Sequence, residues 1–555
     1  MRKSRSCGAN NLMKKSTSVF FTLLLIGATY FTLFWFPNST GARDLNMTYI
    51  FEQDEPAQYP HVVRMLESGH TLSRTIYRFF AYQHYYFGFP YYLYSGLVLL
   101  PIKLLVEWEN VSLNMLLLRQ FASVLPMIAG IMILVYLQTR FQSHIKSVLL
   151  FLILLIVPGV VFNDMWIHPD SLVFLFIVLT FFFLDKDDLQ FGKNFYLAAL
   201  FCGLAVATKL IGLFFFLAIP YYIFLGWHQG RIDRRKAFLA ATLFVTIMVS
   251  VFVLANPFLF WESERAFAFK TQSDLHDAMS KGFVVAYWNS PWAWLQVIEK
   301  WYGVLIFVLF SIVALIIGAV KGEKRLLNQL ILLWAFPFMA YVSFALVIRA
   351  KHFPIPILLP VFSALPAYFM LFAPARFISP LTDYLKKNIW QLTLSLVGVV
   401  IVGIQVFYSL GQDVSLYREI LHREQTSPSL QFYYRIEQTY LSKIVLNRPV
   451  VIFRDVMMYV PNLPNYEDHF NWVISNYDIA VKYNPDLLIL NKQHLYDYTQ
   501  PGQLESAVDP DFGLTYQFYK DVLNGTVKDY VLLYQDEFGI VYISIPLYNQ
   551  FFALH

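Results

Sequence analysis

Long apolar runs separated by short polar turns dominate this sequence between residues 17 and 409. A helix needs about 20 apolar residues to cross the hydrocarbon core of a bilayer. We therefore predict eleven membrane-spanning helices, at about residues 17–36, 117–138, 147–165, 171–184, 195–208, 210–226, 237–255, 302–319, 328–347, 354–373 and 389–409. The first run follows a basic tail and ends without a small-residue cleavage site, which favours a retained signal anchor.

One further apolar stretch, residues 84–106, reads differently. It contains Gly88, Pro90, Gly96 and Pro101 and is rich in tyrosine. Tyrosine is enriched where a protein meets the membrane–water interface, and a straight span rarely carries so many helix-breaking residues. We expect this stretch to lie in the interface or to re-enter the membrane. The alternative is that this stretch crosses the membrane as a twelfth helix, and that an error in the count of another crossing restores the orientation of the remaining loops.

Residues 413–555 have a different pattern, with short apolar runs bounded by turn residues. RPVVIFRD and NPDLLILN read as strands, DHFNWVISNYDIAVKY reads as helical, and DYVLLYQDEFGIVYISIP predicts a hairpin around Asp536–Gly539. We predict a membrane module over residues 1–412, with a first outer loop at 37–116. A small α/β domain outside the membrane follows at 413–555.

The composition agrees with this division. Of the 555 residues, 57% are hydrophobic and 14% are charged, whereas soluble domains carry about 25% charged residues. This excludes an ordinary soluble enzyme, a disordered chain and a nucleic-acid-binding protein, and leaves a polytopic α-helical membrane protein. The net charge of +5 hides two populations, because residues 1–412 carry +12 and residues 413–555 carry −7.

The charge of the turns predicts the orientation. The basic tail and the turns at 139–147, 185–194, 227–237, 320–328 and 374–388 together hold 19 Lys and Arg against six acids. Basic loops stay in the cytoplasm. We therefore expect a cytoplasmic N-terminus and a C-terminal domain outside, in a bacterial or archaeal plasma membrane or the endoplasmic reticulum.

This orientation gathers polar residues from distant segments at the outer face. They are Glu52, Asp54, Glu55, Arg64, His84, Asn163, Asp164, His168, Asp170, Lys209, Asn256, Glu262, Glu264, Arg265, Arg349, Lys351 and His352. Ionisable groups near membrane segments are costly and tend to be functional. Carboxylates could take a proton from an acceptor or hold a metal, and cations could stabilise a departing phosphate.

Each group also has a purely structural interpretation. Asp54-Glu55 and His168-Pro169-Asp170 both stand where a helix begins, and acids there favour the helix dipole. Arg349, Lys351 and His352 could anchor the chain in the interface, His84 could be interfacial, and Glu262 and Glu264 could form a solvated face. Lys209 separates two short apolar runs, which snorkelling alone does not explain.

At these residues the sequence resembles a known family. QDEPAQYPHVVRMLESG resembles the first outer loop of lipid-phosphate-sugar-dependent glycosyltransferases of the GT-C fold, nearest to the protein O-mannosyltransferases and the aminoarabinose transferases of lipid A. In the same order come YQHYYFGFPYYLYSGL, LLLRQFAS around Arg119, NDMWIHPDSLVFLF, GLAVATKLIGLFFF and RAKHFPIPILLPVFSALPA. The resemblance covers roughly residues 17–375. FGFP departs from the family's double proline, and His352-Phe353 replaces the tyrosine expected after Arg349.

The resemblance implies a function. A sugar would pass from a polyprenyl phosphate to a lipid, glycan or protein hydroxyl at the outer face, with inversion and Asp54 as the base. Glu55 and Asp170 would position the acceptor or bind a divalent cation, which Asp54 and Asp170 could hold. No other cofactor is expected. The remaining roles are donor-phosphate binding by Lys209, Arg349, His352 and His84, and acceptor positioning by Arg64 and His168.

A second hypothesis is a non-enzymatic polytopic protein, either a lipid flippase or transporter, or a scaffold that binds glycan. Transporters commonly show internal repeats and paired broken helices, and no such repeat is evident in the sequence. The two hypotheses differ in geometry, because positioned catalysis requires Asp54, Asp170 and Lys209 to converge within about 10 Å.

Overall fold

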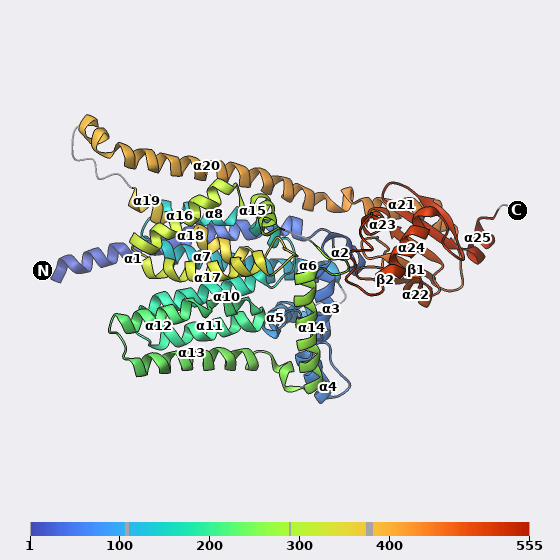
Figure 1. Cartoon of the computed structure of the whole chain (residues 1–555), viewed down its shortest axis with the longest axis horizontal. Coiled ribbons are helices and arrows are strands. Elements are labelled where there is room, and N and C mark those ends of the chain that lie inside the picture. Colours follow the sequence, from blue (N-terminus) through green and yellow to red (C-terminus); the bar gives the residue numbers. More distant parts are fainter. Residues whose placement is uncertain (1, 106–109, 288–289, 373–380, 554–555) are drawn as a thin grey trace.

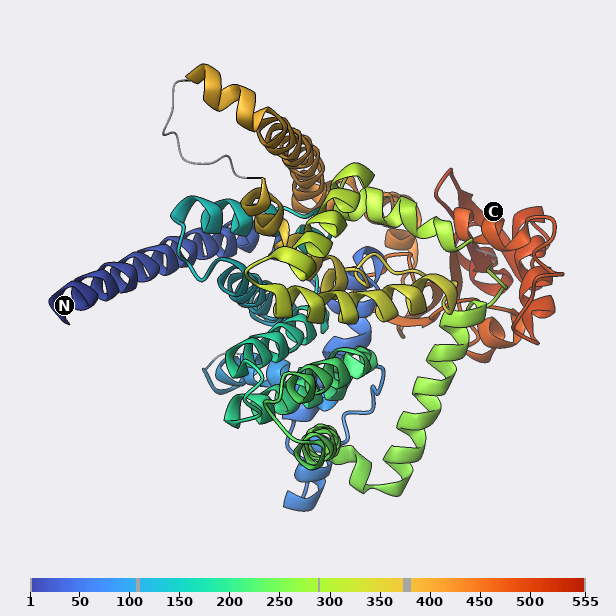
Figure 2. The ribbon, with the colours of Figure 1, turned by 60° about the vertical axis from the view of Figure 1, so that its left-hand side comes forward.

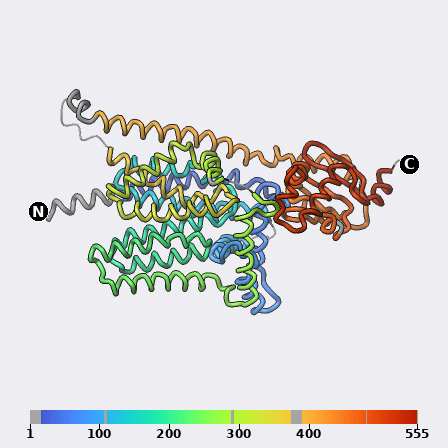
Figure 3. The backbone as a smooth tube through the Cα atoms, in the orientation of Figure 1, coloured from blue at the N-terminus to red at the C-terminus, as the bar shows by residue number. Residues whose placement is uncertain are grey.

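The protein is described here by a computed structural model, which covers residues 2–105, 110–287, 290–372 and 381–553. It consists of a bundle of long helices with a smaller domain of helices and strands at one end (Figure 1). Figure 3 shows the first helix (blue) entering the bundle from the end opposite the C-terminal domain (red). The predicted polytopic helical fold with a small C-terminal α/β domain is confirmed.

The bundle is built from the apolar runs. Its elements are α1 (Arg2–Asn38), α5 (Phe89–Leu105), α6 (Val111–Leu118), the π-helix η1 (Arg119–Val124), α7 (Leu125–Thr139), α8 (His144–Leu155), α9 (Pro158–Asn163), α10 (Asp170–Asp187), α11 (Lys193–Thr208), the 3-10 helix η2 (Leu210–Phe216), α12 (Ala218–His228), α13 (Arg234–Leu254), α16 (Leu305–Lys321), α17 (Arg325–Phe344), α18 (Ile355–Ser363), α19 (Leu365–Leu371) and α20 (Leu381–Thr426). Polar residues start several of them: Asn110, Ser143 and Asp233 each accept a backbone N–H at a helix start.

Each of the eleven expected crossings contains a helix. Among the described residues, six helices are long and apolar enough to span a membrane, or seven if the pair α15–α16 is counted as one bent span. Four shorter apolar helices add to these. The run 147–165 is interrupted, since α8 ends at Leu155 and Pro158 starts α9. Part of the expected basic turn 374–388, residues 374–380, lies outside the described residues.

Helix α5 occupies the stretch whose placement the sequence left open. Figure 1 shows α5 nearly end-on, whereas α7, α10 and α11 run along the length of the bundle. It packs against α3 (Asp54–Leu66), α6 and the end of α11. Helix α5 therefore lies across the end of the bundle that faces the C-terminal domain, the arrangement expected of an interfacial segment.

Short helices cover the same end of the bundle. They are α2 (Leu45–Phe51), α3, α4 (Leu72–Phe80), η3 (Pro257–Phe260), α14 (Glu262–Lys281), η4 (Pro291–Ala293) and α15 (Trp294–Tyr302). Helices α15 and α16 meet at a 90° bend. Figure 2 shows α14 running from the end of α13 to the C-terminal domain.

The C-terminal domain contains a five-stranded sheet in the order β2-β1-β3-β5-β4. Its elements are α21 (Pro428–Thr439), η5 (Leu441–Lys443), β1 (Val450–Asp455), β2 (Tyr466–Asn471), α22 (Tyr477–Lys482), β3 (Leu487–Asn491), α23 (Lys492–Thr499), α24 (Phe512–Asn524), β4 (Tyr530–Gln535), β5 (Gly539–Ser544) and α25 (Ile545–Phe551). Strands β2, β1 and β3 are parallel, while β5 and β4 form the predicted antiparallel hairpin.

Two expectations for this region need correction. DHFN belongs to β2 rather than to a helix, and only Tyr477–Lys482 of that segment is helical. The polar sequence suits β2 because edge strands commonly carry polar and charged residues. The boundary placed after residue 412 marks a change in composition only, because α20 continues without interruption to Thr426.

A close backbone approach fixes the loop before α5. The Gly88 N–H donates to the Thr208 carbonyl at 3.0 Å, and the Phe89 N–H donates to Asn256 Oδ1 at 2.9 Å. A Cβ at residue 88 would lie 1.6 Å from the Ala207 carbonyl oxygen. The loop therefore sits against the end of α11 only because residue 88 is glycine.

We predict that Gly88→Ala lowers the free energy of unfolding by about 1–3 kcal/mol, because the loop must move away from α11. Thermal unfolding of the detergent-solubilised protein measures this. Gly96→Ala is the control, since its Cβ would lie 3.7 Å from Leu66 Cδ2 and alanine stabilises helices by up to about 1 kcal/mol over glycine. Equal melting temperatures for the two variants would contradict the close approach.

Candidate active site

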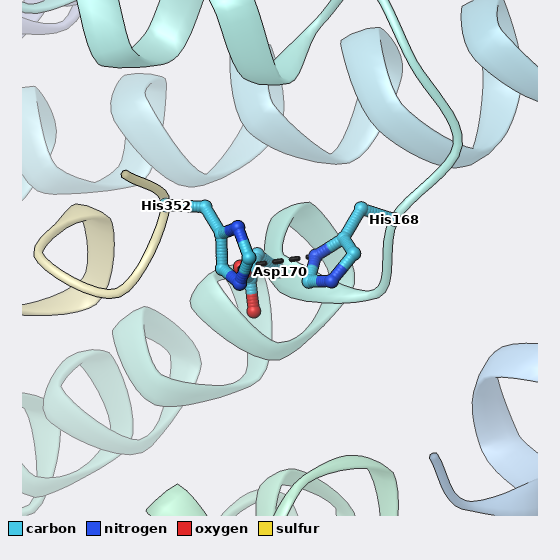
Figure 4. A group of neighbouring side chains, drawn as sticks. All are labelled: His168, Asp170 and His352. Carbon is cyan, nitrogen blue, oxygen red and sulfur yellow. Dashed lines mark ion pairs between the residues drawn. The ribbon is translucent and has the colours of Figure 1, made fainter. Parts of the chain in front are cut away.

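Asp170 lies at the centre of a cluster of ionisable side chains from three distant segments. It is the first residue of α10 and is 1% exposed. Its Oδ1 lies 2.7 Å from Lys209 Nζ, and its Oδ2 lies 3.0 Å from His168 Nδ1 and 3.7 Å from His352 Nε2. Figure 4 shows the two imidazole rings beside the carboxylate. An acid that the sequence could explain as a helix cap is thus surrounded by cations and imidazoles.

Lys209 occupies the predicted break between helices. Helix α11 ends at Thr208 and η2 begins at Leu210, with Lys209 in an extended conformation at φ −154° and ψ 133°. Its ammonium lies 5.9 Å from the ring centre of Phe87 and 5.2 Å from that of Phe353. The side chain is 17% exposed and pairs with Asp170. The ammonium is therefore held by specific contacts, and snorkelling toward the membrane surface alone does not explain its position.

The two histidines are packed against aromatic rings. His168 stacks on Trp166 at 4.5 Å between ring centres and lies 4.3 Å from His352. Burial lowers the pKa of His352 well below its ordinary value, and the neighbouring His168 and Lys209 act in the same direction. His352 is therefore neutral at pH 7 and can only donate or accept a hydrogen bond.

A second ion pair joins the first outer loop to the segment before α18. Lys351 Nζ lies 3.6 Å from Glu52 Oε2, with side-chain exposures of 34% and 21%. The ammonium also lies 3.4 Å from the ring centre of Phe162. Burial raises the pKa of Glu52 to about 7, while Lys351 opposes the rise. The charge of this pair therefore changes near neutral pH.

Asp54 is exposed at the start of α3. No hydrogen bond to its side chain is found in the part of the chain that the structure describes. Asp54 lies within electrostatic reach of Glu52 and Lys351. Asp54, Glu55 and Asp170 all lie within electrostatic reach of the Tyr91 hydroxyl. Asp170 and Lys209 meet directly, as expected, whereas Asp54 makes no ion pair or hydrogen bond with either of them among the described residues.

Glu55, the next residue, faces inward and is fully buried. Its Oε1 accepts from Arg119 Nε at 2.7 Å and its Oε2 from Arg119 Nη2 at 2.5 Å, with both side chains at 0% exposure. Oε1 also accepts the Ile167 N–H at 3.0 Å. Arg119 begins the π-helix η1, a distortion that often occurs at functional sites. This pair ties α3, η1 and the loop before α10 together.

Two further candidates hold the loop before α5. Arg64 donates to the side chain of Gln83, whose backbone has a positive φ of 63°. His84 hydrogen-bonds the Tyr92 hydroxyl, and burial lowers the pKa of His84 to about 3, with His61 acting in the same direction. His84 is therefore neutral at pH 7. Neither side chain has a contact with Asp170 or Lys209 among the described residues.

Arg349 and Glu264 also lie apart from the Asp170 cluster. Arg349 donates to the Ser290 carbonyl at 2.7 Å and to the Ser343 carbonyl at 3.0 Å. Glu264 is buried and accepts hydrogen bonds from the hydroxyls of Tyr77 and Tyr85. The interpretation of Glu264 as part of a solvated face is therefore wrong, because two tyrosines cover it.

The cluster also bears on the expected divalent cation. One ligand atom from each of His168, Asp170 and His352 lies within 4.8 Å of the others. His168 Nδ1 and Asp170 Oδ2 face each other at 3.0 Å, both are buried, and neither has another hydrogen-bond partner in the described structure. Two imidazole nitrogens and one carboxylate oxygen fit a zinc-like dication better than magnesium. The donor set differs from the expected pair of Asp54 and Asp170 because Asp54 lies outside this group.

The Glu52–Lys351 pair and the role of Arg119 were not assigned from the sequence. Glu52 and Lys351 are separated by almost 300 residues, and no local pattern links them. The signal available for Arg119 was an arginine inside an apolar run, because a buried charge requires a partner.

Comparison with known proteins gives one family match. The model of the dolichyl-phosphate-mannose-protein mannosyltransferase family matches residues 76–261. The matched range includes His84, His168, Asp170 and Lys209, begins after Asp54 and ends before Arg349. This match confirms the predicted class, a glycosyltransferase that uses a lipid-phosphate-linked sugar. No curated protein sequence matches the chain.

Several solved structures are similar to this chain, among them two whose protein is bound to a lipid phosphate. ArnT from Cupriavidus metallidurans bound to undecaprenyl phosphate has a TM-score of 0.49 and 12% identity, over 94% of this chain and 97% of that chain. The oligosaccharyltransferase AglB from Archaeoglobus fulgidus, in complex with an inhibitory peptide and a dolichol-phosphate, has a TM-score of 0.48 and 11% identity. That alignment covers 93% of this chain and 79% of that chain.

We predict that Arg119→Met lowers the free energy of unfolding by about 3–5 kcal/mol, because Glu55 would stay buried without a counter-charge. The double variant Arg119→Met/Glu55→Gln should recover part of this loss. Chemical denaturation in detergent measures both. Lys281→Gln is the control: it removes a pair with side chains 62% and 60% exposed, worth less than about 1 kcal/mol. A loss no larger than that of the control would show that the buried pair is not needed for stability.

Proposed function

We propose that this chain moves a monosaccharide from a polyprenyl-phosphate donor to an acceptor hydroxyl at the outer membrane face, with inversion at the anomeric carbon. The observation that carries the proposal is the cluster of Lys209, His168 and His352 around Asp170. The exposed carboxylate of Asp54 lies at the same end of the bundle, at the start of α3. The family match over residues 76–261 supports the same class of donor.

The orientation follows from the charge of the turns. The turns between α10 and α11 and between α12 and α13 lie at the N-terminal end of the bundle, away from the C-terminal domain (Figure 1). Both belong to the basic set expected in the cytoplasm. The N-terminus is therefore cytoplasmic, and the C-terminal domain and the site face outward.

Lys209 binds the phosphate of the donor. Its ammonium is partly exposed and already faces a carboxylate, so the anionic phosphate exchanges with Asp170 or shares the ammonium with it. A preorganised cation stabilises the charge that develops on a leaving group without further reorganisation. His168 and His352 add hydrogen-bond donors to the phosphate oxygens, and the imidazole of His352 does so in its neutral form. If a divalent cation binds His168, Asp170 and His352, it supplies additional positive charge at the same place.

Asp54 acts as the base. As the acceptor oxygen bonds to the anomeric carbon, its proton passes to the Asp54 carboxylate and the bond between the sugar and the phosphate breaks. Polyprenyl phosphate leaves with the electron pair of that bond. A base must reach the acceptor proton directly, and Asp54 meets this requirement because its side chain is exposed.

The other expected roles change with the geometry. Glu55 supports the first outer loop through Arg119, and Arg64 and His84 shape the loop before α5. Arg349 supports the segment that carries Lys351 and His352. The alternative function, a scaffold or a flippase, is less well supported. Neither requires ionisable side chains from three separate segments to meet around the Asp170 carboxylate.

We predict that Asp54→Ala and Lys209→Ala each reduce transfer from dolichyl-phosphate mannose by at least about 10²–10³-fold while expression is unchanged. The measurement is incorporation of labelled sugar into membranes that carry the variant. Glu262→Ala, in the first turn of α14, is a control acid at the same face and should keep normal transfer. Undiminished transfer by Asp54→Ala would rule out the assignment of the base.

We also predict that affinity for dolichyl-phosphate mannose falls about threefold to tenfold as the pH rises through 7. Glu52 gains its negative charge in that range and offsets the positive charge of Lys351 next to the site. The donor is a phosphodiester whose own charge is constant there. Glu52→Gln should bind the donor with much weaker dependence on pH. The same steep dependence in that variant would assign the titration to another group.

A further inference from the structure

Helix α2 is held by the C-terminal domain rather than by the bundle. Met47 is fully buried in the apolar core of that domain. Asn46 Nδ2 donates to the Val460 carbonyl and to Asp468 Oδ2, both at 2.9 Å. The Tyr459 hydroxyl donates to Asp44 Oδ2 at 2.7 Å, and the other oxygen of Asp44 caps α2.

Aromatic and charged contacts complete this interface. Tyr49 lies 4.7 Å from Phe470 and 5.1 Å from Trp472 between ring centres. Arg454, which pairs with Asp468, lies over the Phe470 ring at 4.8 Å. Residues 44, 46, 47 and 49 of the first outer loop are therefore all fixed by one domain.

The turn before α2 is held by the end of α20. Arg423 donates to the Thr40 carbonyl, which Arg119 also uses at 2.8 Å. Glu424 accepts the Gly41 N–H at 2.5 Å and pairs with Arg43. This turn therefore links the buried Glu55–Arg119 pair to the helix that leads into the C-terminal domain.

Helix α2 ends where the candidate site begins. Glu52 is its C-terminal cap, with the Glu52 N–H donating to the Thr48 carbonyl at 3.0 Å. The Glu52 carbonyl in turn accepts the Glu55 N–H at 3.2 Å. Asp54 lies between these two residues. A shift of α2 would therefore move both Glu52 and Asp54.

The same domain contacts a second outer loop. The Ala286 N–H donates to the Ser506 carbonyl at 2.7 Å, and the Val508 N–H donates to the Val284 carbonyl at 2.8 Å. Val284 and Val285 pack with Ile474 and Phe512. This loop follows α14, which crosses the end of the bundle to reach the domain (Figure 2). The C-terminal domain thus holds two loops that leave the bundle at separate points.

We propose that the C-terminal domain is a positioning element of the transfer site, and that Asn46 and Tyr459 are positioning residues that act through α2 on Asp54. This inference rests on the proposed function. Misplacing a reacting group by about 1 Å can cost about 10²-fold in rate. An exposed base cannot be held by its own packing, so the segment that carries it has to be fixed from outside.

The test is the double variant Asn46→Ala/Tyr459→Phe, which removes the polar contacts to α2 and keeps the Arg454–Asp468 pair. The initial rate from saturating dolichyl-phosphate mannose should fall at least about tenfold. The donor KM should change much less than the rate, because Lys209, Asp170 and His352 make no hydrogen bond or ion pair to the C-terminal domain in the described structure. Of the groups that affect donor binding, only Glu52 moves with α2. Hydrogen exchange should become faster in residues 44–55.

The matched control is Tyr530→Phe/Tyr542→Phe. It removes hydrogen bonds to the Pro485 and Val522 carbonyls, inside the same domain and away from α2. This variant should keep the normal rate and the normal exchange of residues 44–55.

Each outcome decides the proposal. A normal rate in the α2 variant overturns it, and so does a loss of rate in the control or a parallel rise in donor KM. Asp54→Ala is run in the same assay. If that variant is inactive while the α2 variant is normal, only the positioning role fails. If Asp54→Ala is active, the assignment of the base fails instead.

Discussion

The buried ion pair between Glu55 and Arg119 is the interaction on which the outer end of this protein depends. Charges without solvent are costly unless they are paired and hydrogen-bonded. Arg119 meets this condition with its planar group, placing two donors on Glu55 and a third on the carbonyls of Asn38 and Thr40. Lysine has no such fork of donors. The pair therefore fixes the end of α1 and the start of α3 through Arg119, and the loop that leads to Asp170 through the Ile167 N–H, which Glu55 accepts.

Three ion pairs at this end of the protein differ in how far their side chains are exposed. Glu55–Arg119 is fully buried, Asp170–Lys209 is open only at the lysine, and Glu52–Lys351 is partly open on both sides. A fully satisfied pair has no capacity left for a ligand and acts as structure. The partly open pairs keep their cations beside aromatic rings and accessible to an anion. The structural and functional uses of charge are thus separated by burial, which explains how so many ionisable groups occur together at a membrane face.

The helices, the hairpin and the break at Lys209 could be predicted because apolar runs and helix signals are local. Strand β2 could not, because its polar sequence is stabilised by pairing with β1, which only the folded domain provides. The composition of the site was partly readable. Asp170 and Lys209 were correctly placed at the same end of the bundle, but Glu52 and Lys351 were not paired, since their contact depends on how distant segments pack. Glu264 was misjudged for the same reason.

The two neighbouring acids of the first outer loop show most clearly what the sequence does not contain. Successive helical residues point about 100° apart, so in α3 one of the pair can face the bundle while the other faces out. The local sequence around Asp54-Glu55 does not determine which of the two acids faces the bundle. Arg119 determines the outcome by pairing with Glu55. Asp54 is left exposed at the start of α3, which the neighbouring Glu55 anchors. The preceding helix α2 is anchored separately, by the C-terminal domain. Asp54 can therefore remain exposed and still be held in one position, because the backbone on both sides of it is held by buried contacts.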